Sequence, residues 1–142
     1  MKNRILNLLV ITFLFQFSMM AQSLKSHLWQ DRVILLFADD FQHITLQKQL
    51  QLFEKNPDGL KERKLVVYQI TPNAIRKNGE DFFEKNFEEN ICKEFNPKND
   101  EFAFVLIGLD GSKKMHSVKL VSLEKLFGVI DRMPMRQWEM KN

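Results

Sequence analysis

The sequence predicts an α/β domain with the element order β-α-β-α-β-β-α and a central mixed four-stranded sheet. Three observations lead to this prediction. Residues 32–38 form a continuous apolar run, which is typical of a strand buried on both faces. Apolar residues recur at helical spacing after each of the first two strand-like runs, which indicates connecting helices. Asp110-Gly111 lies between two further strand-like runs and is a dipeptide typical of a hairpin turn.

The first half of the domain is predicted to be two parallel strands joined by a helix. The strand at 32–38 is followed by a helix over residues 42–55, whose apolar side chains recur at helical spacing. The sequence Asn-Pro-Asp-Gly at 56–59 ends this helix. A second strand over residues 65–70 is rich in β-branched side chains and stops before Pro72.

The next segment is predicted to be a helix that begins after a break at Asn78-Gly79. Glu80 and Asp81 suit its first turn, because acidic side chains are stabilised at the positive end of the helix dipole. Apolar side chains at every fourth position from 83 to 95 form its buried face. A third strand over residues 102–107 follows a polar loop.

The last part of the chain is predicted to be a strand and a helix. Residues 115–121 form the hairpin partner of the third strand, and Ser122 can cap the helix that follows. Apolar residues at helical spacing over 123–130 form one face of that helix, and Pro134 stops it and opens a short terminal helix. A βαβ unit followed by a ββα unit is the thioredoxin topology.

Residues 1–21 have the pattern of a secretory signal peptide. Lys2 and Arg4 form a basic start, residues 5–17 are mostly apolar, and Ala21 precedes a plausible cleavage site. An apolar run of this length is short for a membrane span, so we prefer a signal peptide to an uncleaved anchor. We therefore expect an exported protein, periplasmic or extracellular, with no stable membrane span after cleavage.

The expected mature chain, residues 22–142, is one domain of nearly neutral charge. The formal net charge of the whole chain is +3, and Lys2 and Arg4 in the signal segment account for two of these charges. The remaining charge of +1 argues against a nucleic-acid binder, which needs a large basic patch.

Two features near the C-terminus resemble a known family. These are the hydrophobic strand and Asp-Gly turn at 102–111, and the ending Asp-x-Met-Pro-Met-Arg-x-x-Glu-Met at 131–140. They resemble the DUDES-type domain, a thioredoxin-like domain of unknown function found in secreted bacterial proteins and in vertebrate matrix proteins with sushi repeats. The family often has an acid where this chain has Lys64. Further positions included in the resemblance are Trp29, Arg32, Gln47 and Arg63.

Redox chemistry of the thioredoxin type is excluded by the cysteine content. That chemistry needs cysteines where the first strand runs into the first helix. Here residues 37–43 read Phe-Ala-Asp-Asp-Phe-Gln-His, without sulfur. Cys92 is the only cysteine and lies in the second helix. We interpret it as a half-buried structural thiol, and the alternative is a redox role without a resolving partner.

The same junction offers a weak candidate cation site formed by Asp39, Asp40 and His43. Their spacing is poor for a metal, and acids in front of a helix commonly cap it. We therefore prefer capping, and we expect no metal and no cofactor.

A candidate polar cluster is predicted at the opposite end of the sheet. The topology brings three arginines and three acids to this end, close to the C-terminal tail. We prefer a structural clamp on the tail to a ligand site, because the charges can satisfy one another. The residues are Arg32, Arg63, Asp110, Asp131, Arg136 and Glu139.

The function predicted from the sequence is a non-redox binding or structural module with an unknown protein or small-molecule partner in the cell envelope. The alternative is an enzyme of unrecognised type that uses acids and arginines rather than cysteines. A pocket with converging carboxylates and a raised carboxyl pKa would favour the enzyme.

Overall fold

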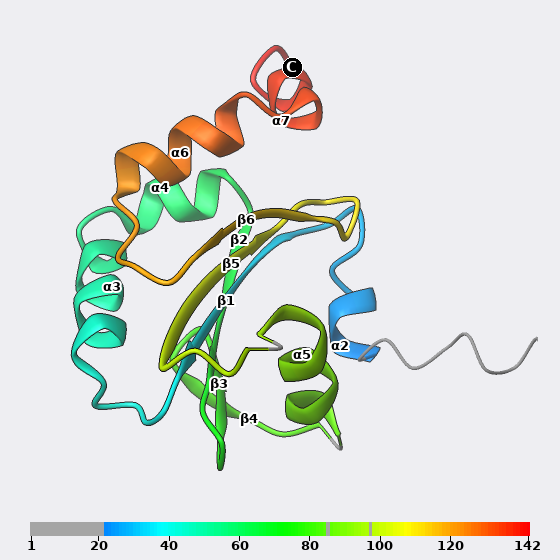
Figure 1. The fold of residues 1–142 in the computed structure, drawn as a ribbon. Coiled ribbons are helices and arrows are strands. Elements are labelled where there is room, and N and C mark those ends of the chain that lie inside the picture. The colour runs from blue at the N-terminus through cyan, green and yellow to red at the C-terminus, as the bar shows by residue number, and fades with distance from the viewer. Residues whose placement is uncertain (1–21, 85, 97) are drawn as a thin grey trace, which may run out of the picture.

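The computed structural model describes residues 22–84, 86–96 and 98–142 (Figure 1). The predicted signal segment lies outside these residues. Within them, no helix has the length and apolar character needed to cross a membrane. In chain order the elements are α2 (Gln22–Lys25), β1 (Arg32–Ala38), α3 (Ile44–Glu54), α4 (Pro57–Glu62), β2 (Leu65–Ile70), β3 (Ile75–Lys77), β4 (Glu80–Phe82), α5 (Phe87–Phe95), β5 (Phe102–Ile107), β6 (Lys113–Ser117), α6 (Leu123–Asp131) and α7 (Pro134–Glu139).

The sheet is mixed, as predicted, but the described residues form six strands in it rather than four. The strand order is β4-β3-β2-β1-β5-β6. β1 and β2 are parallel, with Arg32 opposite Leu65. The other neighbouring pairs are antiparallel. The two additional strands, β3 and β4, extend the β2 side of the sheet.

Both faces of the sheet are covered by helices, so β1 is buried along its whole length. Successive side chains of a strand point to opposite faces. Val33 and its alternating neighbours pack on α2 and α5, whereas Ile34 and its neighbours pack on α3 and α6. Figure 1 shows α5 and α2 on one side of the sheet and α3, α4 and α6 on the other.

The prediction of a helix from Glu80 is wrong in its first half. Glu80–Phe82 is a strand paired with β3, and α5 begins only at Phe87. Asn78 and Gly79 have φ values of 50° and 86° and form the two-residue connection between these strands. Asn-Gly favours this hairpin geometry because both positions need positive φ. The pair that we interpreted as a chain break is therefore a hairpin turn.

The sequence at 56–59 ends one helix and starts another. The side chain of Asn56 accepts a hydrogen bond from the backbone N–H of Gly59 over 2.8 Å, and Pro57 is the first residue of α4. Asn at the N-cap and Pro at the first helical position are both favourable. We predicted only the end of α3.

The C-terminal hairpin is present, but its turn is longer than an Asp-Gly type I′ turn. Of the dipeptide only Gly111 has a positive φ, 76°, and the backbone N–H of Gly108 donates to the carbonyl of Ser112 over 2.9 Å. β6 ends at Ser117, so the predicted strand over 115–121 is too long at its end. The predicted cap is confirmed: the hydroxyl of Ser122 accepts from the backbone N–H of Lys125 over 3.2 Å.

Candidate functional site

Two chain segments meet at the carboxylate of Asp131, the last residue of α6. Arg63, which follows α4, donates from Nε to Oδ1 over 2.9 Å and from Nη2 to Oδ2 over 2.7 Å. Arg136 of α7 donates from Nε to Oδ1 over 3.2 Å. A two-point arginine–carboxylate contact fixes orientation as well as distance. It therefore sets how α6 lies against the start of β2.

Arg32 is fully buried at the start of β1 and pairs with the end of α7. Its Nη1 lies 3.1 Å from Oε2 of Glu139 and donates to the carbonyl of Arg63 over 3.0 Å. Lys64 lies 3.3 Å from the other carboxylate oxygen of Glu139. A buried charge is strongly unfavourable unless it is paired. Glu139 is thus the counter-ion that allows an arginine at this buried position.

Arg136 connects α7 to α4. Its Nη1 donates to the carbonyl of Glu62 over 3.2 Å, and its Nη2 forms an ion pair with the Glu62 carboxylate. The Arg136 side chain is only 5% exposed, although the Glu62 side chain is 62% exposed. We call the connected residues the arginine network, which comprises Arg32, Glu62, Arg63, Lys64, Asp131, Arg136 and Glu139.

The arginine network favours the ionised form of two of its carboxylates, those of Asp131 and Glu139. Burial raises the pKa of Asp131, but hydrogen bonds and charge from Arg63 and Arg136 outweigh it and leave the pKa below its ordinary value. Burial likewise opposes ionisation of Glu139, and Arg32 and Lys64 together lower its pKa. Such groups suit ion pairing rather than proton donation.

Asp110 lies outside the arginine network, contrary to our prediction. Its carboxylate accepts from the backbone N–H of Ser112 over 3.0 Å and from Lys114 over 2.8 Å. The hydrogen bond from Lys114 is the largest cause that lowers the pKa of Asp110 to about 2. Aspartate in a turn readily bonds to the chain just beyond it. These local partners keep Asp110 in its own hairpin.

The arginine network lies at one end of β1, and the connection from β1 to α3, which begins at Asp39, lies at the other. Arg32 is the first residue of this seven-residue strand and Ala38 is the last. At about 3.3 Å per residue the two ends are roughly 20 Å apart. This is the separation that the topology predicts.

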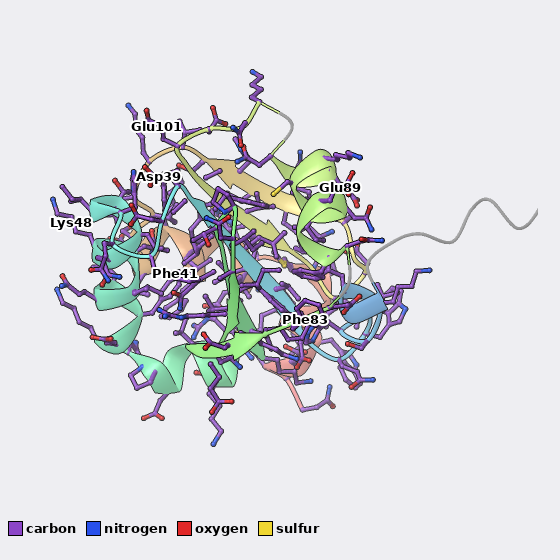
Figure 2. The ribbon with its side chains drawn as sticks, turned by 90° about the horizontal axis from the view of Figure 1, so that it is seen from below. Asp39, Phe41, Lys48, Phe83, Glu89 and Glu101 are labelled. Atoms are coloured by element: carbon purple, nitrogen blue, oxygen red, sulfur yellow. The ribbon has the colours of Figure 1, made fainter. Side chains whose placement is uncertain are left out.

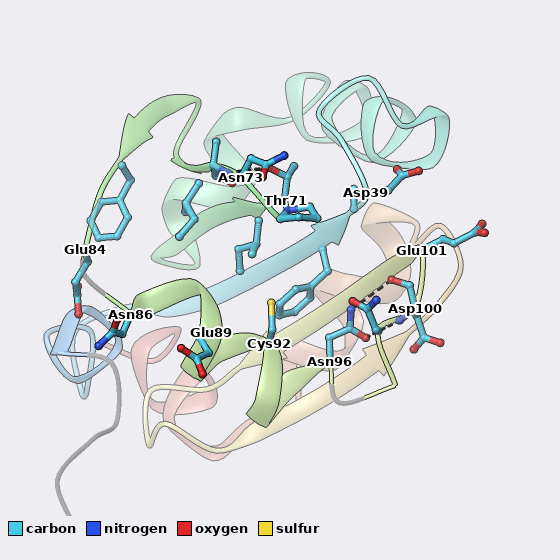
Figure 3. Close-up of a pocket in the computed structure, with 18 of the residues that line it drawn as sticks. Asp39, Thr71, Asn73, Glu84, Asn86, Glu89, Cys92, Asn96, Asp100 and Glu101 are labelled. Carbon is cyan, nitrogen blue, oxygen red and sulfur yellow. Dashed lines mark hydrogen bonds between the residues drawn. The ribbon is translucent and has the colours of Figure 1, made fainter.

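A groove with a volume of about 820 Å³ opens at the Asp39 end of the sheet (Figure 3). Its apolar floor is formed by residues from the ends of β1 and β2, from the β3–β4 hairpin and from α5. Phe83, with 92% of its surface exposed, lies on its edge. The groove thus combines a buried apolar base with an open, solvent-facing mouth.

The polar side chains of the groove carry carboxylates and amides, together with the hydroxyl of Thr71, which donates to the carbonyl of Ala74. Among the described residues, no lysine or arginine lines it. Glu89 forms an exposed ion pair with Lys93 of the same helix over 2.5 Å. The amide of Asn96 is occupied by the backbone of Asp100. The carboxylate residues that line the groove are Asp39, Glu84, Glu89, Asp100 and Glu101.

The weak candidate cation site does not form, and the aspartates do not cap α3. Asp39 accepts from the backbone N–H of Asp40 over 2.9 Å, and Asp40 accepts from that of Gln42 over 2.6 Å. His43 occupies the N-cap position without a side-chain cap, and its ring stacks on Phe102 at 6.0 Å between centroids. Within the described residues, no three His, Cys, Asp or Glu side chains are grouped to hold a metal. The two acids instead close the turn that precedes α3.

A family model for a domain of unknown function, DUF4174, matches residues 23–139. The chain belongs to this family. A solved structure of a reduced 2-Cys peroxiredoxin from Plasmodium vivax is similar to the DUF4174 domain, with a TM-score of 0.56 and 18% identity. The alignment covers 83% of this chain and 84% of that one, and it shows a shared thioredoxin-like fold. No curated protein matches.

The fold likeness does not extend to a cysteine pair, because the DUF4174 domain has one cysteine and cannot form a disulfide within the chain. Cys92 lies on α5, is half-buried and lines the groove (Figure 3). A dithiol reaction within one chain needs two cysteines. The segment from Asp39 to His43, where β1 leads into α3, contains none.

The groove is not predicted by the sequence. Its lining residues come from five separate segments, and the helical spacing places Phe83 on a buried helix face, whereas it is exposed. The Asn78-Gly79 dipeptide was a usable signal, because a hairpin there moves Phe83 out of a helix and onto the surface. No comparable local signal identifies Asp100 or Glu101.

Proposed function

We propose that this DUF4174 domain is an exported binding module that keeps the thioredoxin-like scaffold without a redox centre. The observation that supports this most is the groove beyond the end of β1, beside a strand–helix junction without sulfur. In open α/β sheets, ligands bind beyond the carboxyl ends of the strands. Binding sites also combine apolar walls with a few polar groups. The groove has this location and this composition.

Phe83 supports a binding role for the groove. A single exposed apolar residue is ordinary on a protein surface. Phe83, however, lies beside the half-buried Phe82 at the edge of the cavity, where an aromatic side chain can contact a partner. Figure 2 shows Phe83 just after the end of β4, on the same side of the molecule as Glu89.

For the arginine network we propose a structural role as a clamp on the C-terminal helices. Its carboxylates each contact at least one cation, and Arg32 is fully buried. Little of the network therefore remains for a ligand. An enzyme that uses these acids and arginines has less support, because the pKa values of Asp131 and Glu139 are lowered and a general acid needs a raised one.

The export part of the proposal rests on the basic start and apolar run of residues 1–21. The resemblance to DUDES-type domains, which occur in secreted proteins, supports the same compartment. We accordingly propose that the partner is periplasmic or extracellular, and that it is not a nucleic acid.

Site-specific photo-crosslinking in cells tests the binding role. A benzoylphenylalanine at position 83 faces the groove mouth, and the same residue at position 118 is the matched control. Val118 is 50% exposed and follows β6, at the other edge of the sheet. We expect covalent adducts from position 83 and none from position 118. Equal labelling at both positions, or none at either, contradicts a binding role for the groove.

A further inference from the structure

We infer that the groove binds an extended peptide segment that carries a basic residue on each side of an apolar side chain. The inference rests on the proposed binding function and adds the chemical class of the partner. It follows from the placement of charge, apolar surface and amide groups around the cavity.

One end of the groove is a cluster of three carboxylates. Ala38 and Phe102 are opposite each other in the antiparallel β1–β5 pair. Asp39 follows Ala38, and Asp100 and Glu101 precede Phe102, so the three acids flank one end of that pair. Within the described part of the chain, none of the three forms an ion pair with a lysine or arginine. This end therefore attracts a cation.

A second acidic group lies at the other end. Glu84 follows β4, and its carbonyl accepts from the backbone N–H of Phe87, the first residue of α5. Glu89 lies on the same helix, and its exposed pair with Lys93 is of a kind that contributes little. Figure 3 shows Glu84 and Glu89 on one side of the groove and Asp39, Asp100 and Glu101 on the other.

Apolar surface separates the two acidic ends. Phe37, Ile70 and Ile75 form its base, each less than a tenth exposed, and Cys92 borders it from α5. Along the groove the surface is acidic, then apolar, then acidic. A ligand that complements it carries a positive charge at each end and an apolar side chain between them. Charge complementarity of this kind provides specificity and faster association.

Side-chain amides favour a peptide over a simple amine. Asn73, Asn86 and Asn99 line the groove and are exposed. An asparagine amide offers both a donor and an acceptor, which is what a peptide group requires. A polyamine has no carbonyl to accept from these amides, so it would leave half of their hydrogen-bonding capacity unused.

Fluorescence anisotropy with the full purified chain tests the inference. The probes are fluorescently labelled peptides with lysine at each end. One, three or five apolar residues, each valine or phenylalanine, separate the two lysines. We expect saturable binding for at least one length, weakened by salt because exposed charges are screened. Peptides with glutamate ends, or with glycine in place of the apolar residues, should bind at least about tenfold more weakly. Equal binding of the glutamate peptides, or no binding of any lysine peptide, overturns the inference.

Two charge-matched variants locate the site. The first variant combines Asp39→Asn, Asp100→Asn and Glu101→Gln. Its affinity for the lysine peptide should fall about tenfold, as expected for the loss of three partly exposed ion pairs between protein and peptide. The control combines Asp58→Asn, Glu54→Gln and Glu124→Gln on the helices of the other face, and its affinity should change by less than about twofold. Equal weakening in both variants would mean non-specific attraction and would contradict the inference.

Spermine separates a peptide site from a general cation site. Displacement of the labelled peptide by an equal concentration of spermine would overturn the peptide assignment. The crosslinking result at position 83 separates this inference from the proposed function. If position 83 forms adducts but no lysine peptide binds, the binding role of the groove stands and only the proposed ligand class is contradicted. If neither adducts nor peptide binding is found, both the proposed function and this inference are contradicted.

Discussion

Arg63 and Asp131 lie 68 positions apart in the chain and form a two-point ion pair, with N–O distances of 2.9 and 2.7 Å. The guanidinium of Arg63 also lies 4.1 Å from the centroid of the Phe127 ring. The ion pair with Asp131 and the cation–π contact with Phe127 together hold Arg63 in one position. The pair joins α6 to the segment between α4 and β2, and through Arg136 it reaches α7.

Asp131→Asn should lower the free energy of unfolding by about 1–3 kcal/mol, because it removes charge-assisted hydrogen bonds to Arg63 and Arg136. Urea denaturation of the purified domain measures this. Asp110→Asn is the matched control: it breaks an exposed pair with Lys114 and should cost less than about 1 kcal/mol. Equal effects of the two substitutions would contradict a clamp.

The stability of the domain should fall as the pH drops through the acidic range. The folded pKa values of Asp131 and Glu139 lie below ordinary values of 3.8 and 4.5. The stabilisation from these groups is therefore fully present above those values and is lost as the pH falls through the lowered folded values. Urea midpoints measured from about pH 6 to pH 2.5 should decrease, and Asp131→Asn should flatten the decrease. An equally steep profile in the variant would argue against this assignment.

Removal of residues 133–142 should strongly destabilise the domain. The deletion removes Glu139 and leaves Arg32 buried without its carboxylate, a loss typically worth about 3–5 kcal/mol. Thermal melts followed by circular dichroism provide the measurement. An unchanged melting temperature, together with loss of adducts from position 83, would instead assign the tail to partner binding.

The protein should show no thiol–disulfide activity. Cys92 is its only cysteine, so the chain cannot form the internal disulfide that a dithiol catalyst uses. In an insulin-reduction assay with dithiothreitol, turnover should equal the reagent blank, and Cys92→Ser should not change it. Turnover above the blank that disappears in the variant would refute this prediction.

The mature protein should begin near Gln22. The basic start and apolar run of residues 1–21 predict cleavage after Ala21 during export. Intact-mass analysis of protein recovered from the envelope fraction measures the N-terminus directly. A mass that retains Met1 would show that the segment is not removed.

Several elements follow from local pattern alone. The continuous apolar run at β1 predicts a strand covered on both faces, and the Ser122 cap marks the start of α6 correctly. The β3–β4 hairpin differs from the prediction, because apolar residues at every fourth position from 83 to 95 are typical of a helix, whereas Asn78-Gly79 favours a hairpin. Of the six residues in the predicted polar cluster, five are within the arginine network. Asp110 is outside it, because its nearest donors are in its own turn.

The amino-acid sequence alone predicts the order of the principal strands along the chain and the mixed character of the sheet, and it shows that there is no cysteine pair. These properties depend on side-chain periodicity and on residue identity, which are local. The ion pair between Arg63 and Asp131, and the presence of Asp39 and Glu101 around one groove, follow from the folded chain alone. Both bring distant segments together, and they depend on backbone paths that no local pattern encodes. Periodicity specifies which face of an element is buried, whereas a site depends on where several elements end in space.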